Sequence, residues 1–374
     1  MSVGAYRESE LVFMKQDVYR VLCDTPGLKG REIAKKLGKE KPEVNSFLSK
    51  NKDTFYQDES YCWFNKNVGT TVEFPSSWID AAKYESILAD YENLFASQGG
   101  VTFVLPQGCS LLLEPISRLL ALSNQLEHHC IDVTIDMADC GNTRHFLNRA
   151  GFFDLLSSGV KVLPKRPKSS TAKVFKGTCD SLVEFGSICP KSKNKELIVS
   201  LHSSFLDKTC EDYYTVALTV FSEFIGNVSE HSNSLIEGFA ALQIYEPNYK
   251  RDHIQTVISD SGMGVVSTLR STLQDHYPEL YGRFPDDGVE SDIGLVLEVF
   301  SKGNITRHGK ASGRGLGFKS TREQASKFDA DLSIRLDTFN IKLRYRGGEL
   351  ADPVIQKNLT KMNGTHICFD FYID

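Results

Sequence analysis

Apolar residues recur at helical spacing along residues 217–231, with polar residues between them. The apolar positions are Ala217, Phe221, Phe224 and Val228. They are three or four residues apart, so they would share the face of a helix that packs against a core. Glu223, Asn227 and His231 follow one another at intervals of four and would share the opposite face. The pattern predicts an amphipathic helix that carries a carboxylate, a carboxamide and an imidazole in one row.

Strand patterns flank two glycine-containing segments farther along the chain. Residues 254–258 form a short β-branched run that leads into residues 260–264, Asp-Ser-Gly-Met-Gly. Residues 363–365, Asn-Gly-Thr, open an alternating segment near the C-terminus. Its apolar positions are Ile367, Phe369, Phe371 and Ile373. Between these two strands, residues 312–318 read Ser-Gly-Arg-Gly-Leu-Gly-Phe.

The N-terminal part of the chain has the pattern of a small separate module. We expect three helices, around Val18 and at residues 29–37 and 42–50, followed by two short strands between residues 55 and 64. Helix–helix–turn–helix–hairpin is the order of a winged helix. The sequence therefore predicts a winged-helix-like domain over residues 1–72.

The middle of the chain alternates between strand and helix patterns. A connecting helix is expected over residues 76–96, with Ser76 or Ser77 as its N-cap. Strand–helix–strand–helix follows between residues 101 and 156, which is typical of a small α/β layer. A basic segment with Pro and Ser then indicates a hinge. The expected divisions after the first domain are 73–98 for the connecting helix, 99–165 for the α/β module, 166–190 for the hinge and 191–374 for the C-terminal domain.

The composition is that of an ordinary soluble protein. The 374 residues include 41% hydrophobic and 24% charged residues, which is enough apolar material for sizeable cores. The longest apolar runs are shorter than the ~18 residues that a membrane span needs, so we expect no membrane partner. Nine cysteines without a Cys-x-x-Cys pair indicate reduced thiols and a cytoplasmic protein.

Net charge excludes a nucleic-acid signature for the whole chain, but one segment differs. The chain carries −5 overall, whereas residues 29–52 contain eight basic and three acidic residues, a local charge of +5. Such a basic strip is an electrostatic footprint that could meet DNA phosphates or an acidic protein surface. Both partners remain open at this point.

The C-terminal motifs point to nucleotide chemistry when they are taken together. A carboxylate one helical turn from a carboxamide can hold a hydrated Mg²⁺ ion and orient a water molecule. Glycines at the start of a helix expose backbone N–H groups, where phosphates bind well. Each motif alone has a plainer interpretation: a solvated helix face, an Asx-type turn at Asp260, or a flexible surface loop.

Four elements follow one another along the chain: the helix with Glu223 and Asn227, the segment 260–264, the glycine-rich segment 312–318 and the strand that opens at residues 363–365. In this order they resemble the GHKL ATP-binding superfamily, which includes histidine kinases, the gyrase B subunit, MutL and anti-sigma serine kinases. The Glu-x-x-x-Asn-x-x-x-His pattern is most similar to the anti-sigma-type bacterial ATP-binding proteins. The resemblance covers about the last half of the chain. It implies an α+β fold whose C-terminal domain is an α/β sandwich, with a mixed sheet on one side and helices on the other, and it implies ATP and Mg²⁺ as ligands.

The resemblance also implies roles for individual residues. Asp260 would accept a hydrogen bond from the adenine amino group, Asn227 would coordinate Mg²⁺, and Glu223 would be the general base for an attacking water. The remaining nucleotide-binding positions implied by the motifs are Gly262, Gly264, Gly313, Arg314, Gly315, Gly317, Lys319 and Thr365. The interval between the glycine motifs corresponds to the ATP lid of that family, in which Lys302, Arg307 and Lys310 are candidates for phosphate contact or members of an ordinary basic loop.

The two front modules carry weaker resemblances. The middle module is similar to STAS-type domains through residues 131–136, but it lacks their phosphorylatable serine, so a docking or scaffold role for a protein partner is expected. Residues 41–63 are loosely similar to Z-alpha-type winged helices through Asn45 and Trp63, without the Pro-Pro-x-Trp wing.

Three functions follow from these patterns. The first is a slow Mg-dependent ATPase that acts as a nucleotide-controlled switch in bacterial regulation or defence. The second is an anti-sigma-type serine/threonine kinase. The third is a DNA- or protein-binding regulator that uses ATP as a structural ligand. A homodimer is a further candidate assembly for any of them.

Overall fold

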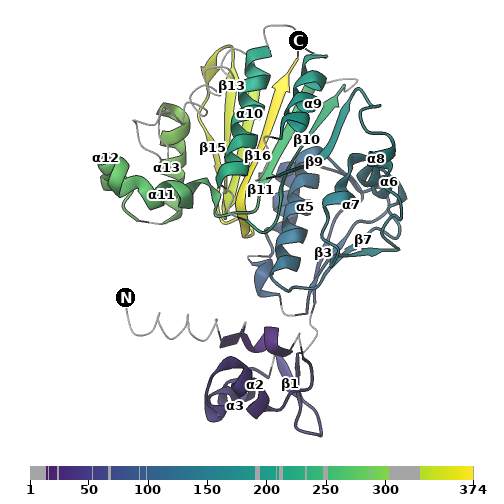
Figure 1. Cartoon of the computed structure of the whole chain (residues 1–374), viewed down its shortest axis with the longest axis vertical. Helices are drawn as coiled ribbons and strands as arrows, with labels where there is room; N and C mark the ends of the chain where they lie inside the picture. The colour runs from purple at the N-terminus through teal and green to yellow at the C-terminus, as the bar shows by residue number, and fades with distance from the viewer. Residues whose placement is uncertain are drawn as a thin grey trace.

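The computed structural model describes most of the chain. The described residues are 14–15, 17–22, 25–52, 54–65, 69–91, 93–97, 99–189, 194–207, 209, 214–231, 234–246, 252–286, 288–302 and 329–373. The fold is mixed α+β, with several sheets and helices (Figure 1). None of the described helices is long and apolar enough to cross a bilayer.

The C-terminal half is built on an eight-stranded sheet. Its strands are β9 (Leu182–Ile188), β10 (Gly238–Tyr245), β11 (His253–Asp260), β12 (Ala330–Asp337), β13 (Phe339–Arg346), β14 (Glu349–Leu350), β15 (Val354–Gln356) and β16 (Met362–Tyr372). The order is β14-β13-β12-β16-β11-β10-β9, with β15 paired to β13. The long C-terminal strand β16 lies at the centre, between β12 and β11.

The expected mixed sheet is wrong, because every pairing between described strands of this sheet is antiparallel. β10–β11 and β12–β13 are joined by short connections, and short connections return the chain in the opposite direction. Consecutive residues of each strand alternate between two faces, as in any strand, and each face meets a different layer.

One face of the sheet packs against helices from the C-terminal half. The helices in contact with the sheet are α9 (Lys195–Leu206), α10 (Tyr214–His231) and α11 (Gly264–His276). Helix α13 (Val289–Lys302) adds apolar side chains to the same core, and α12 (Pro278–Arg283) contacts α11 without a buried residue of its own. The core beneath them joins Phe221 and Phe224 of α10 to Ile258, Phe369 and Phe371 of the sheet. The rings of Phe224 and Phe369 are 5.2 Å apart between centroids. The predicted apolar face of residues 217–231 is confirmed, with Ala217, Phe221 and Phe224 buried and Val228 half-buried.

The opposite face of the large sheet is covered by the middle module. The sequence predicts this module but does not predict where it packs. This module has a four-stranded parallel sheet in the order β3-β5-β7-β8. The strands are β3 (Thr70–Glu73), β5 (Val101–Val104), β7 (Val133–Asp136) and β8 (Lys161–Leu163), and the helices are α4 (Ala81–Leu88), α5 (Leu113–His128), α6 (Gly141–Ala150), α7 (Phe152–Leu155) and α8 (Thr171–Val174). Its core is continuous with Phe239, Ala241, Val257 and Cys368 of the large sheet.

Helix α5 lies between the two sheets (Figure 1). All residues from Leu113 to Leu126 are buried, the polar ones included. A helix that is buried all round is a core helix, so the middle module and the C-terminal half share one interior.

Two expectations for the middle region are wrong. The helix expected over residues 76–96 is only Ala81–Leu88, and Asp80 is its N-cap through a bond to the Lys83 N–H. The segment expected to be a hinge, 166–190, contains strand β9 at the edge of the large sheet. Its composition is basic at the start, but the strand near its end buries Leu182, Val183 and Phe185.

The N-terminal module has a core of its own. Residues 17–22 are helical, followed by α2 (Gly30–Leu37), α3 (Lys41–Lys50) and the antiparallel strands β1 (Phe55–Gln57) and β2 (Trp63–Asn65). The element order matches the sequence prediction. The side chain of Asn45 packs against α2, because a Cβ atom on Gly30 would lie 1.9 Å from Asn45 Oδ1.

Candidate functional site

The C-terminal end of β11 brings four predicted site residues together. Asp260 is the last residue of β11, and its backbone partner in β16 is Thr365. The Gly262 N–H donates to Asp260 Oδ1 at 2.9 Å, and the Val265 N–H, next to Gly264, donates to Thr365 Oγ1 at 3.0 Å. The sheet register therefore places Asp260, Gly262, Gly264 and Thr365 in one small region.

Asp260 has the environment of a ligand-binding carboxylate. Burial raises the pKa of Asp260 to about 6, and the hydrogen bond from the Gly262 N–H lowers the pKa by less than burial raises it. Oδ1 already accepts from this backbone N–H, which leaves Oδ2 for a donor from a ligand. A buried carboxylate with a remaining acceptor position is favourable for one directed hydrogen bond.

Two glycines allow the backbones to approach closely here. Gly364 has a φ of +91°, and a Cβ atom there would lie 1.9 Å from the Asp260 carbonyl oxygen. Gly264 has a φ of +76°, and its Cβ would lie 3.1 Å from the Gly364 carbonyl oxygen. Both conformations are strained for other residues. The sequence predicts a role for Gly264, whereas the close contact of Gly364 with the Asp260 backbone becomes visible only in the structure.

Helix α10 approaches the same end of the sheet. A Cβ atom on Gly238 would lie 2.5 Å from Val228 Cγ1 and 2.9 Å from the Ser259 carbonyl oxygen. Just beyond the helix, Ser234 Oγ donates to the Ser261 carbonyl oxygen at 3.3 Å. The helical turn that carries Asn227 therefore lies beside the end of β11. Asn227 is half-buried, as is Glu223 one turn earlier.

Several predicted residues lie outside the part of the chain that the structure describes. These are Arg307, Lys310, Gly313, Arg314, Gly315, Gly317 and Lys319. Lys302 is the last residue of α13, and the side chains of Lys302 and His231 are not described. The phosphate-binding part of the predicted site thus stays a prediction.

The middle module contributes Gln125, which sequence reasoning misses. Its side chain is fully buried on α5. Gln125 Nε2 donates to Ser261 Oγ and to the Asn363 carbonyl oxygen, each at 2.9 Å. Gln125 Oε1 accepts from the Asn363 N–H at 2.9 Å. Ser261 follows Asp260 and Asn363 precedes Gly364, so one amide contacts both segments of the candidate site.

A neutral histidine supports the same segment from within the sheet. Burial lowers the pKa of His366 to about 3. Its Nε2 lies 2.9 Å from the Asn363 carbonyl oxygen and its Nδ1 lies 2.5 Å from Ser259 Oγ. Since a carbonyl oxygen can only accept, the proton is on Nε2, and the Ser259 hydroxyl donates to Nδ1.

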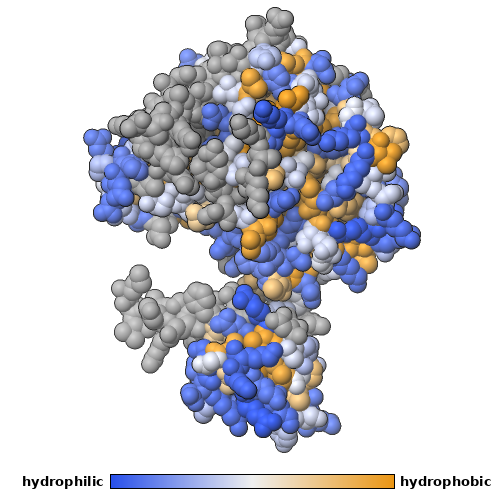
Figure 2. Space-filling view, viewed as in Figure 1, coloured by the Kyte–Doolittle hydropathy of each residue, from blue (hydrophilic) through white to orange (hydrophobic). Residues whose placement is uncertain are grey.

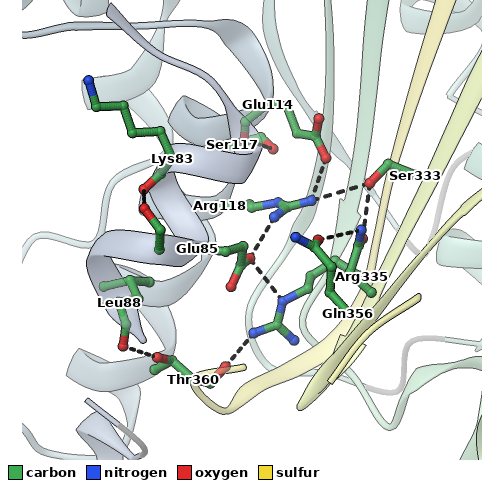
Figure 3. A network of polar contacts seen from close by, with 12 residues as sticks. Lys83, Glu85, Leu88, Glu114, Ser117, Arg118, Ser333, Arg335, Gln356 and Thr360 are labelled. Atoms are coloured by element: carbon green, nitrogen blue, oxygen red, sulfur yellow. Dashed lines mark hydrogen bonds and ion pairs between the residues drawn. The ribbon is translucent and has the colours of Figure 1, made fainter. Parts of the chain in front are cut away.

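A cluster of buried charges holds the middle module on the sheet (Figure 3). Arg118 of α5 donates to Glu85 of α4 at 2.5 Å, to Glu114 and, at 3.3 Å, to Ser333 of β12. Arg335 of β12 donates to Glu85 at 3.0 Å. The Arg335 guanidinium also donates to the carbonyl oxygens of Leu336, Asp337 and Thr360. Buried charges are tolerated only when they are paired in this way.

The comparisons with known proteins leave the family open: no protein-family model and no curated protein matches this chain. Within the described residues, no three His, Cys, Asp or Glu side chains gather as a metal site. A functional assignment therefore rests on the geometry at the end of β11 and on the sequence motifs.

Proposed function

We propose that the C-terminal half is a GHKL-type domain that binds Mg-ATP, and that the protein is a slow Mg-dependent ATPase acting as a nucleotide-controlled switch. The observation that carries this proposal is the meeting of Asp260, Thr365 and the Asn227 turn of α10 at one end of the large sheet. These elements come from distant parts of the chain, and each belongs to one of the motifs that resemble the ATP-binding superfamily.

Asp260 would select the base. Its carboxylate lies at a strand end with one oxygen engaged by Gly262, and the adenine amino group is the complementary donor. A guanine base carries a carbonyl at the corresponding position, which would meet the carboxylate as a second acceptor. We therefore expect ATP to bind in preference to GTP.

Asn227 and Glu223 would serve the phosphates. The carboxamide oxygen of Asn227 suits Mg²⁺, which prefers oxygen ligands and is commonly shared with substrate phosphates. Such an ion would neutralise charge that develops on the transferred phosphoryl group. Glu223, one helical turn earlier, would accept the proton of the attacking water. Each of the two residues thus has a separate chemical task.

Phosphotransfer to a serine or threonine is the second candidate, because it uses the same pocket and differs only in the acceptor. Incubation of the purified chain with Mg-ATP labelled on the γ-phosphate tests both. Free phosphate supports hydrolysis, and label on the protein or on an added partner supports a kinase. Absence of ATP binding in calorimetry would remove both and leave the regulator hypothesis without its nucleotide.

For the front modules we propose a winged helix and a STAS-like scaffold. Helices α2 and α3 followed by the β1–β2 hairpin support the first, and the four-stranded parallel sheet supports the second. Hydrophilic residues cover much of the visible face of the N-terminal module (Figure 2). Its exposed Lys35 and Lys41 could meet duplex DNA, while Lys39 is paired with Glu43 and Lys36 donates to Thr25.

A protein partner of the middle module would bind away from α5. That helix is enclosed between the two sheets, so its surface is not available for docking. A nucleotide-controlled switch would then act on a middle module that already shares a core with the C-terminal half. We also propose that the protein is cytoplasmic and that it forms a homodimer.

A further inference from the structure

We infer that Gln125 of the middle module is a positioning residue for the base-binding end of the C-terminal domain, so that the middle module helps to set nucleotide affinity and base selectivity. This inference rests on the proposed function, because it concerns the same site. It goes beyond it by assigning part of that site to a different module.

The hydrogen bonds of Gln125 hold the backbone at Asn363 in position. Its amide group makes both an accepting and a donating bond to one residue, the N–H and C=O of Asn363. This two-point contact resembles the pairing of a strand with its neighbour, and it fixes the positions of the two peptide units on either side of the Asn363 α-carbon. Asn363 lies near the start of β16, where pairing to β12 shifts register between Leu336 and Asp337. At this irregular point the Gln125 amide provides hydrogen bonds that a regular ladder would supply.

A displacement of Asn363 would reach Asp260 directly. Gly364 follows Asn363, and its α-carbon is packed so tightly on the Asp260 carbonyl that no methyl group would fit. Thr365 comes next and holds the Val265 N–H at the start of α11. Close-packed backbones transmit small shifts, because they have no free volume to absorb them.

The same amide also contacts the other side of Asp260. Gln125 Nε2 donates to the hydroxyl of Ser261, whose carbonyl oxygen in turn accepts from Ser234 beyond α10. Gln125 therefore links the loop after β11 and the start of β16. These two segments carry the residues proposed to recognise adenine.

Loss of this amide should shift the loops without undocking the module. Helix α5 is anchored at its other end by bonds from the Leu113 N–H to Tyr245 and from the Glu114 N–H to Gln255, and in the middle by Arg118. The Asn363 carbonyl would still accept from His366. Besides this carbonyl, the groups that would lose a hydrogen bond to Gln125 are the Asn363 N–H and the Ser261 hydroxyl, both in the candidate site.

One variant of the full chain and one matched control variant test the inference. Gln125→Met replaces the amide by an apolar side chain of similar length. Asn124→Leu makes the same kind of change at the neighbouring buried position, whose amide bonds only within the middle module, to the Leu155 carbonyl and the Ser157 N–H. Calorimetry of Mg-ATP and Mg-GTP gives the affinity and the ratio of the two affinities for each protein.

We expect Gln125→Met to weaken ATP binding about tenfold and to lower the ATP-over-GTP ratio, while Asn124→Leu leaves both near wild type. The ratio is the decisive readout, because general destabilisation would lower the two affinities together. Equal behaviour of the two variants would overturn the inference while the proposed function stands. A wild-type chain that binds neither nucleotide would overturn the proposed function and the nucleotide role of Gln125 together.

Ser261→Ala is the second variant if Gln125→Met does not fold. It removes one hydroxyl partner of Gln125 on a half-buried residue, and we expect a smaller loss of ATP affinity, about threefold, in the same direction. Hydrogen exchange then gives a readout without nucleotide. Faster exchange at the Val265 amide in Ser261→Ala supports the coupling, and an unchanged rate there contradicts it.

Discussion

Arg335 of β12 and Glu85 of α4 are 250 residues apart in the chain and form an ion pair in which Arg335 Nε lies 3.0 Å from Glu85 Oε1. Both side chains are at most 2% exposed. Glu85 Oε1 also accepts from Arg118, so a single carboxylate oxygen bonds guanidinium groups from the middle module and from the large sheet. This shared carboxylate makes the interface between the two parts specific.

The first prediction concerns the stability of this interface. Glu85→Ala would leave Arg118 and Arg335 buried without the carboxylate they share, and breaking a buried ion pair in this way costs about 3–5 kcal/mol of unfolding free energy. Glu290→Ala is the control, since it removes the same side chain from an exposed pair with Lys357 and should cost about 0–1 kcal/mol. Chemical denaturation of both variants measures the difference, and similar losses would contradict the importance of the cluster.

The second prediction concerns base recognition. Asp260→Asn presents an amide in place of the carboxylate and should weaken Mg-ATP binding about tenfold or more, because a buried donor of the ligand loses its charged acceptor. Asp286→Asn is a matched control: Asp286 Oδ1 accepts from the Gly288 N–H at 3.0 Å in the same type of turn, on an exposed residue. Titration calorimetry with each variant decides the point, and an unchanged affinity of Asp260→Asn would remove the adenine assignment.

The third prediction concerns pH. Burial raises the pKa of Asp260 to about 6 from its ordinary value of 3.8. The raised value means that protonated Asp260 favours the folded state, so its contribution to stability is fully present below pH 3.8 and is lost as the pH rises through about 6. Binding has the opposite dependence, since the ionised carboxylate is the stronger acceptor for the adenine amino group.

ATP affinity of the wild type should therefore increase between pH 5 and pH 7. Ligand phosphates also titrate near pH 6, so the comparison is made with Asp260→Asn, which lacks the carboxylate but meets the same ligand. We expect the ATP affinity to increase more steeply with pH in the wild type than in Asp260→Asn. Parallel curves for the two proteins would show that Asp260 does not contribute to the pH dependence.

The fourth prediction separates metal binding from proton transfer. Glu223→Gln keeps the shape of the side chain and removes the base, so we expect Mg-ATP binding close to wild type and turnover reduced by about 10²–10⁴. Asn227→Ala removes a ligand for Mg²⁺ and should weaken both binding and turnover. Calorimetry and phosphate release on the two proteins give the comparison. Wild-type turnover by Glu223→Gln would favour the regulator that uses ATP as a structural ligand.

The fifth prediction concerns the N-terminal module. The full chain should bind duplex DNA weakly, and its affinity should fall steeply with salt because phosphate contacts release counterions. Alanine at both Lys35 and Lys41, which are exposed, should reduce this binding more than Lys39→Ala, since Lys39 is already paired with Glu43. Fluorescence anisotropy with a labelled DNA duplex at low and high salt measures the affinity of each protein for DNA. No binding at low salt would assign the module to protein contacts.

Local periodicity determined several elements of this protein before any contact was known. The apolar face of α10, the strand before Asp260, the alternating strand β16 and the helices of the N-terminal module all follow from spacing along the chain. Such patterns are readable because each element must present one apolar face to a core, whatever the partner is. The motif residues Asp260 and Thr365 are predicted by the resemblance to the ATP-binding superfamily and not by periodicity.

Only the tertiary structure decided what lies against these faces. Glu85, Arg118 and Arg335 have the residue types of a solvated surface, and their burial depends on partners far away in the chain. Gln125 carries no periodic or motif signal, and Gly364 stands in the Asn-Gly-Thr segment without a predicted role of its own. The importance of these two residues comes from one amide and one missing side chain at the Asp260 backbone. A polar side chain is stable in a core only if its partner is already in place, and that condition belongs to the assembled fold.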